Sequence, residues 1–539
     1  MLTMNPPARV AALAVAVALL AGCGADTTDG AESATSSTPP SPSRLSDVPP
    51  PLVPAMPLPE NAVGNAVAKL DGLIEDLMSK SGIPGMAVAV VHGGKPIYAK
   101  GFGVKNNTLT DEAFNKVGPD TVFQLASLSK PLSATVVATL VGQDQVSWDT
   151  PIVSKLPWFA LSDPAATQMV TVGDMFSHRS GLPDHAGDLL EEVGYDRRQV
   201  LERLRRLPVG QFRTSYAYTN FGLTAGAEAV AANTGKSWED LAAETLLGPL
   251  GMTSTSYQFS EYEARPDRAV GHLHVDDRYE PRYVRNAQPQ SPAGGVSSSV
   301  NDMTRWMAMV LADGRHDGTQ LIDPKALLPA ITPQVVSDRG AEPAMRSGFY
   351  GYGFNVGTTS GARTEFSHSG AFELGAASNV VFLPSADVAI VALTNATPAG
   401  VPEALTAQFA DLVQFGEVRE DWFALYGKAF EDMEKPVGSL AGQSRPRNAA
   451  PPPEPFESYA GVYDNDYWGP ATVTQRDGGL ELTVGPRGSY TLQPWDGNVF
   501  TFPVASENAP PGTVSTATFD GGKLTLEYFD DEGLGVFVK

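Results

Sequence analysis

Ser127 and Lys130 form the residue pair with the clearest capacity for chemistry in this sequence. They lie three residues apart in Ala-Ser-Leu-Ser-Lys-Pro-Leu, and an apolar run at 134–141 follows them. The serine and a proline in the first turn predict a helix that begins at about Ser127. On that helix the Lys130 amine can take the proton of the Ser127 hydroxyl and make it a nucleophile. The pair alone is weak, because a capping serine beside a surface lysine gives the same pattern.

Tyr218 and Asn220 form a second pair, in the segment Tyr-Ala-Tyr-Thr-Asn-Phe-Gly at 216–222. On an extended or turn segment, two side chains at this spacing could point into one site. A phenol can relay a proton, and an amide can hold a substrate carbonyl. By itself, Tyr-x-Asn more often marks a turn.

His368, Ser369 and Gly370 form a third motif, which Ala371 follows. An extended strand here could offer a backbone N–H to the oxyanion that develops during acyl transfer. A single histidine before Ser-Gly is more often a polar residue with an ordinary hydrogen bond. This motif therefore indicates a function only together with the other two motifs.

Two predicted hairpins supply an antiparallel sheet from both ends of the region that holds these motifs. One joins apolar runs at 86–91 and 96–99 through a Gly-Gly turn, and the other joins runs at 379–383 and 388–393. Apolar residues at helical spacing over 63–77 predict an amphipathic helix before the first hairpin. Helical segments and Pro- and Gly-rich loops lie between the hairpins, so we expect an α+β fold.

The chain of 539 residues is longer than one core normally supports, and its pattern changes after a Pro-rich segment. We expect a first domain at 61–436, a linker at 437–455 and a second domain at 456–539. The second domain has short alternating runs, such as 480–484 and 524–529, separated by Asp-Gly and Gly-Gly turns. This pattern predicts a small antiparallel barrel or sandwich.

The N-terminal segment reads as an export signal. Residues 1–23 hold an arginine, a short apolar run and then Leu-Ala-Gly-Cys, with the only cysteine of the chain, Cys23, at the end. The last four residues resemble a bacterial lipobox, which implies lipidation of Cys23 and anchoring on the outer side of the cytoplasmic membrane. Residues 24–60 are rich in Ser, Thr and Pro and predict a disordered tether.

Charge and composition argue against two classes of partner. Lys+Arg number 38 against 61 Asp+Glu, a net charge of -23, which disfavours nucleic acid. His272 and His274 have strand spacing, but no cysteine or clustered carboxylate completes a metal site, so we expect no metal. We expect the acidic segment at 188–192 to be a solvated face.

Taken in order, the three motifs resemble the serine beta-lactamase and penicillin-binding-protein superfamily, class C type. The resemblance covers about residues 61–436. Supporting segments are Ser-His-Arg-Ser-Gly-Leu-Pro at 177–183, Pro-Leu-Gly-Met at 249–252 and Pro-Ala-Gly-Gly-Val-Ser-Ser at 292–298. It implies a beta-lactamase/transpeptidase-like fold, in which an antiparallel sheet with flanking helices carries a helical subdomain. The second domain resembles an accessory barrel that shapes or caps the cleft.

The resemblance also implies a mechanism through an acyl-enzyme, without a cofactor. Ser127 is then the nucleophile, and Lys130 and Tyr218 move its proton. Asn220 holds the substrate amide or the lysine. The backbone N–H groups of Ser127 and Ala371 form the oxyanion hole. The third motif contributes His368, Ser369 and Gly370 to substrate binding.

One departure from the family pattern bears on the substrate. Beta-lactamases carry Lys-Thr-Gly where this chain has His368 and its two neighbours, and a histidine is mostly neutral at pH 7. Arg179 or Arg363 could replace the missing cation. We expect an esterase or D-amino-acid peptidase acting on a peptide or small-molecule ester or amide, with D,D-carboxypeptidase or weak beta-lactamase as the alternative. The alternative outside enzymes is a lipoprotein that binds cell-wall fragments without turnover.

Overall fold

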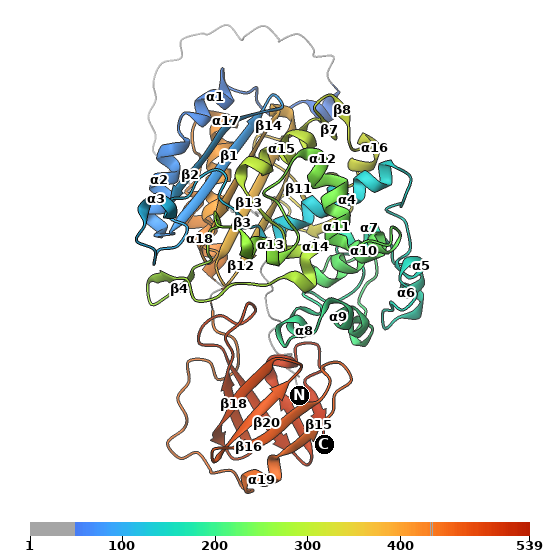
Figure 1. Ribbon diagram of the computed structural model, residues 1–539, viewed down its shortest axis with the longest axis vertical. Coiled ribbons are helices and arrows are strands. Elements are labelled where there is room, and N and C mark those ends of the chain that lie inside the picture. Colours follow the sequence, from blue (N-terminus) through green and yellow to red (C-terminus); the bar gives the residue numbers. More distant parts are fainter. Residues whose placement is uncertain (1–48, 432, 434) are drawn as a thin grey trace, which may run out of the picture.

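The computed structural model describes residues 49–539 apart from 432 and 434. The predicted signal peptide, Cys23 and most of the predicted tether therefore lie outside the described residues. Within the described part of the chain, no helix has both the length and the hydropathy needed to cross a bilayer. Figure 1 shows a large body of helices and sheet, with a smaller β-structure beside it.

An eight-stranded antiparallel sheet forms the centre of the larger body (Figure 1). Strands from the two ends of this body meet in its middle, because β1 pairs with β14 from Met86 opposite Thr394 to His92 opposite Val388. Both predicted hairpins are present, as β1 with β2 and as β13 with β14. Across the sheet the strands are β2 (Lys95–Gly103), β1 (Gly85–His92), β14 (Val388–Thr394), β13 (Ala376–Leu383), β12 (Thr364–Phe372), β11 (Asn355–Thr358), β10 (Gly348–Tyr350) and β9 (Val335–Asp338).

Two hydrophobic cores lie on the two faces of this sheet. Successive side chains of a strand point to opposite faces, so Val88 and Val90 enter one core while Ala87 and Ala89 enter the other. The helix predicted at 63–77 is split into two. The first core is completed by α1 (Ala62–Val67), α2 (Leu70–Ser81), α17 (Val401–Phe415) and α18 (Trp422–Glu431).

A helical subdomain covers the opposite face of the sheet (Figure 1). Its central helix, α4 (Ser129–Gly142), is almost wholly buried, which agrees with its apolar sequence on all sides. The predicted α+β fold with flanking helices and a helical subdomain is confirmed. The other principal helices here are α7 (Val172–Phe176), α10 (Asn220–Ala232), α14 (Ser291–Gly294) and α15 (Val300–Leu311).

The C-terminal domain is a nearly closed antiparallel barrel, the first of the two forms that the sequence predicts. Eight strands follow one another in chain order, and a bridge between Asp464 and Val538 brings the last strand back to the first. The barrel interior is filled by aromatic and aliphatic side chains such as Phe500 and Phe519. The strands are β15 (Gly461–Tyr463), β16 (Ala471–Arg476), β17 (Gly479–Val484), β18 (Gly488–Asp496), β19 (Val499–Pro503), β20 (Val514–Asp520), β21 (Lys523–Leu526) and β22 (Val536–Val538).

The barrel packs against the helical subdomain. The Tyr195 hydroxyl donates a hydrogen bond to the Trp468 carbonyl at 2.6 Å, and the Arg487 N–H donates one to the Val193 carbonyl at 2.8 Å. The predicted linker runs along the barrel, where the Val437 carbonyl accepts a backbone hydrogen bond of 3.0 Å from the start of β20.

Candidate active site

Ser127 lies in a tight 3-10 turn, η2 (Ala126–Leu128), immediately before α4. The expected helix therefore starts where the sequence indicates, although the Ser127 hydroxyl does not cap it. Ala126 has a φ of 48°, a left-handed conformation that a residue with a Cβ adopts only under constraint. The Ser129 hydroxyl supplies that constraint, since it donates to the Ala126 carbonyl at 2.6 Å and accepts from the Val296 N–H at 3.0 Å.

Lys130 occupies the centre of a buried hydrogen-bond network. Its Nζ lies 3.0 Å from Ser127 Oγ, 2.7 Å from Asn220 Oδ1 and 3.0 Å from the Ala293 carbonyl. The side chain has no exposed surface. Burial lowers the pKa of Lys130 to about 7, against the opposing effect of the Asp188 carboxylate. A large share of the amine is therefore neutral near pH 7 and can accept the Ser127 proton.

Tyr218 completes the group around the nucleophile. The Lys130 Nζ lies 4.4 Å from the centroid of its ring. Among the described residues its hydroxyl has no hydrogen bond of normal geometry. Burial raises the pKa of Tyr218, and the nearby Ser127 hydroxyl offsets part of that rise. The phenol therefore stays protonated and is suited to donate a proton, while the neutral lysine is suited to accept one.

Asn220 links this group to a carboxylate that the sequence did not single out. Asn220 is the first residue of α10, and its Nδ2 donates to Asp188 Oδ2 at 2.8 Å. The same oxygen lies 2.8 Å from His185 Nδ1. Because Asn220 Oδ1 accepts from Lys130, the amide fixes the lysine on one side and the carboxylate on the other.

The expectation that the acidic segment at 188–192 is a solvated face is wrong. This segment forms α8 (Asp188–Glu192), in which Asp188 is 4% exposed and Glu191 is 2% exposed. Glu191 can be buried because Arg285 pairs with it at 2.6 Å. These partners are distant in sequence, and only the spacing of His185 to Asp188 could have suggested a role.

The third motif lies on β12, directly beside the nucleophile turn. A Cβ on Gly370 would lie 2.1 Å from the Leu125 carbonyl oxygen and 2.9 Å from the Leu128 nitrogen, so only glycine permits this approach. β11 pairs with β12 no further than Ser367. The rest of β12, which includes Ala371, therefore has one edge without a strand partner, next to Ser127. An oxyanion could reach backbone N–H groups at such an edge.

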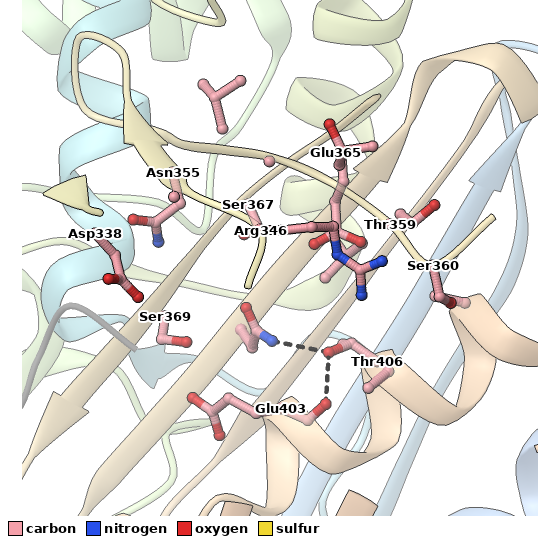
Figure 2. A pocket seen from close by; sticks show the side chains of 18 of the residues that line it. Asp338, Arg346, Asn355, Thr359, Ser360, Glu365, Ser367, Ser369, Glu403 and Thr406 are labelled. Atoms are coloured by element: carbon pink, nitrogen blue, oxygen red, sulfur yellow. Dashed lines mark hydrogen bonds between the residues drawn. The ribbon is translucent and has the colours of Figure 1, made fainter. Parts of the chain in front are cut away.

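The side chains of the third motif point in two directions. His368 is buried, with Nε2 2.8 Å from the Tyr350 hydroxyl and Nδ1 2.5 Å from the Ser369 carbonyl. Burial, together with the positive charge of Lys130, lowers the pKa of His368 to about 3, so the imidazole is neutral. Ser369 faces the other side of the sheet, where Figure 2 shows it at a separate cavity. Its side chain is thus not brought together with Ser127.

Neither arginine suggested as a replacement cation is held at this site. The Arg179 Nε donates to Asp174 at 2.8 Å, and the Arg363 guanidinium donates to the Met56 carbonyl at 2.6 Å. Within the described residues no group of three or more His, Cys, Asp or Glu side chains is arranged to hold a metal ion.

The barrel contacts the turn that follows Ala371. Glu507, in the loop between β19 and β20, accepts hydrogen bonds from the backbone N–H groups of Glu373 at 2.9 Å and Leu374 at 3.4 Å. Arg285 lies 3.9 Å from the same carboxylate. Burial raises the pKa of Glu507 to about 7. The accessory domain is thus joined to the sheet two residues beyond the predicted oxyanion hole.

Comparison with known proteins identifies the family. Residues 70–415 match the family described as Beta-lactamase, and residues 445–528 match one described as Domain of unknown function (DUF3471). The first match covers more than half of the chain, so this protein belongs to the beta-lactamase and penicillin-binding-protein family of serine hydrolases. The resemblance seen in the sequence is confirmed.

Individual relatives carry several different names. The chain is 28% identical to the unguisins hydrolase ungD' of Aspergillus campestris, over 74% of this chain and 75% of that protein. It is 29% identical to penicillin-binding protein 4 of Amycolatopsis lactamdurans, over 72% and 95%. It is 27% identical to a D-aminopeptidase of Brucella canis, over 53% and 52%. The octameric penicillin-binding protein homologue from Pyrococcus abyssi shares the fold, with a TM-score of 0.56, 19% identity, and coverage of 88% of this chain and 100% of that one.

Proposed function

We propose that this protein cleaves an amide or ester whose leaving group carries no free carboxylate, through an acyl-enzyme at Ser127. The observation that carries the proposal is the position of Lys130. Its buried amine lies 3.0 Å from Ser127 Oγ, and its pKa is lowered to about 7. A lysine that only stabilised the fold would not need to lie beside Ser127 with a lowered pKa. The same argument disfavours a protein that binds its ligand without turnover.

The reaction follows from the roles that the geometry supports. Neutral Lys130 takes the Ser127 proton as Oγ attacks the substrate carbonyl, and backbone N–H groups of the turn and of β12 stabilise the oxyanion. Tyr218 gives its proton to the departing amine or alcohol and recovers one from Lys130. Water then attacks the acyl-enzyme with the same groups acting in reverse, which releases the acid and restores Ser127.

The substrate class rests on the missing cation. A lysine in place of His368 would attract the carboxylate of a penicillin or a peptide terminus, whereas the buried neutral imidazole, 2.8 Å from the Tyr350 hydroxyl, cannot. This supports an esterase or a peptidase that acts on D-amino-acid residues. The similarity to a D-aminopeptidase favours the peptidase within this pair.

A substrate panel tests the proposal. It would hold D-alanine p-nitroanilide, its L-isomer, p-nitrophenyl butyrate, an N-acylated D-alanyl-D-alanine peptide and nitrocefin. We expect turnover of the D-anilide or the ester, and none by Ser127→Ala. Higher kcat/KM on the D-alanyl-D-alanine peptide or nitrocefin would contradict the assignment.

A penicillin-binding D,D-carboxypeptidase is the second candidate. Penicillin-binding protein 4 of Amycolatopsis lactamdurans matches over 95% of its length, and the chain also matches a D-alanyl-D-alanine-carboxypeptidase/endopeptidase of Escherichia coli. The two candidates differ in their response to penicillin. A carboxypeptidase of this kind would form a long-lived penicilloyl adduct, whereas our first proposal predicts little or none after incubation with benzylpenicillin. Intact-protein mass measurement distinguishes them.

We also propose that the protein acts on the outer side of the cytoplasmic membrane, anchored by a lipid on Cys23. The Leu-Ala-Gly-Cys sequence at 20–23 supports this. Cell fractionation of the native chain and Cys23→Ala tests it. The native chain should be in the membrane fraction and the variant should not, and equal distribution would contradict the anchor.

A further inference from the structure

A cavity opens on the face of the sheet opposite Ser127. It measures about 160 Å³ and lies between the outer faces of β11, β12 and β13 and the helices α17 and α18. Its wall includes Ser367 and Ser369, whereas His368 and Gly370 on the same strand face the nucleophile. The thickness of one strand thus separates this cavity from the active site.

Two of the acidic residues in the cavity have donors within the protein. Asp411 accepts hydrogen bonds from the Trp422 indole at 2.7 Å and from the Arg419 N–H at 2.9 Å. Asp338 accepts one from the Gly340 N–H at 2.8 Å. These two carboxylates are accounted for by the local structure of α17 and of the end of β9.

The other two acidic residues are not accounted for in this way. Glu403 is 3% exposed, and among the described residues its Oε2 has no hydrogen-bond partner. Glu365 lines the same cavity from β12, and burial raises the pKa of each carboxyl to about 7. Figure 2 shows both side chains at the cavity, one from the strand and one from the helix. The Ser369 hydroxyl and the backbone N–H of Glu403 favour the charged form of the Glu403 carboxyl, but its Oε2 atom is left without a donor in the described part of the chain. A buried carboxylate oxygen without a donor is costly, so a cation here would be bound strongly.

The remaining wall favours an organic cation. Trp422 and Tyr426 supply aromatic rings, which attract ammonium groups. Asn379 and Thr406 supply polar atoms joined by a hydrogen bond of 2.8 Å. No group of acidic and histidine side chains among the described residues is arranged for a metal. At roughly 30 Å³ for each water-sized group, the cavity has room for about five such groups, the size of a short-chain amine.

We propose that this cavity binds a small primary amine, with its ammonium group between Glu403 and Glu365 and its chain against Trp422 and Tyr426. The site is distinct from the catalytic one and is independent of the function proposed above. One cation of the chain, Arg346, also lines the cavity, from an exposed position before β10. The Arg346 guanidinium could itself bind the two carboxylates, so the test must distinguish this contact from binding of an added amine.

Calorimetric titration of the full chain with putrescine tests the proposal, with 1,4-butanediol as the neutral probe. At pH 8 we expect one putrescine per chain, no binding of the diol, and the same affinity in Ser127→Ala. Loss of one charged partner should weaken binding about tenfold or more in Glu403→Gln and in Glu365→Gln. The matched control is Glu417→Gln, an exposed carboxylate just after α17, which should bind as the native chain does.

We also expect weaker putrescine binding at pH 5.5, where Glu403 and Glu365 are protonated. The titratable and charged groups that face the ligand are Glu365 and Asp338 from the strands, Arg346 before β10, Glu403 and Asp411 from α17, and Tyr426 from α18. Absence of putrescine binding to the native chain would overturn the proposal. So would a Glu403→Gln or Glu365→Gln variant that binds putrescine as tightly as the native chain does. Binding seen only in Arg346→Ala would also overturn it, because the chain's own guanidinium would then occupy the site.

Discussion

Replacing Asp188 by asparagine should make the enzyme active at lower pH. The carboxylate favours the charged form of Lys130, so its removal lowers the pKa of that amine. The variant can keep the local hydrogen bonds, because the amide oxygen of the introduced asparagine can still accept from Asn220 and His185. Its new amide nitrogen takes the place of Asp188 Oδ1, which has no hydrogen-bond partner among the described residues.

The size of the pKa shift follows from the distance between the Lys130 amine and the Asp188 carboxylate. The amide of Asn220 separates Lys130 from Asp188 through hydrogen bonds of 2.7 and 2.8 Å. Unit charges on the order of 7 Å apart interact by about 2 kcal/mol at an effective dielectric constant near 20. His185, whose pKa is raised despite its burial by its contact with Asp188, offsets part of this when it is protonated. We therefore expect a shift of about one pKa unit.

The assay is the pH profile of kcat/KM on the best substrate of the panel. The acidic limb, which reports the neutral fraction of Lys130 in the free enzyme, should move down by about one unit in Asp188→Asn. Asp184→Asn, which removes a nearby exposed carboxylate, is the matched control and should shift the limb less. Asp188→Ala should instead lower the rate at all pH values, because Asn220 loses its anchor. An unchanged or raised limb in a folded Asp188→Asn protein would refute the reasoning.

Three further predictions concern other parts of the site. Tyr218→Phe should reduce kcat about 100-fold on an anilide but less than about tenfold on a p-nitrophenyl ester, whose leaving group needs no proton; equal losses would contradict the donor role. Gly370→Ala should abolish activity and lower Tm, because its Cβ would lie 2.1 Å from the Leu125 carbonyl oxygen; native activity would show that the strand can retreat. The raised pKa of Glu507, about 7, means that its contribution to stability is complete below about pH 4.5 and is lost as the pH rises through 7. Glu507→Gln should flatten this dependence by at most about 3 kcal/mol in urea unfolding, and an unchanged slope would contradict it.

Local patterns in the sequence were sufficient for much of the fold. The period-two runs and tight turns predicted both hairpins and the C-terminal barrel, because those signals depend only on neighbouring residues. The helix at 63–77 was predicted as one element but is broken at Ala68 and Lys69, although its apolar residues face one core. Periodicity reports which face is buried, and it does not report where the helix axis turns.

The candidate site could be predicted only where its motifs are continuous in sequence. The structure brings Ser127, Lys130, Tyr218 and Asn220 together, as the family resemblance implied. Asp188 was missed because its partner is 32 positions away along the chain, and a buried ion pair looks like surface charge in a sequence. The sequence motif groups Ser369 with its neighbours, but strand geometry turns its side chain to the opposite face.

The most direct test of the central claim is the intact mass of the protein after incubation with a fluorophosphonate, followed by peptide mapping. We expect one phosphonyl adduct on Ser127, formed faster at pH 8 than at pH 6 as Lys130 becomes neutral, and no adduct on Ser127→Ala. An adduct that persists in Ser127→Ala, or a native chain that stays unlabelled at both pH values, would contradict an activated nucleophile at this position.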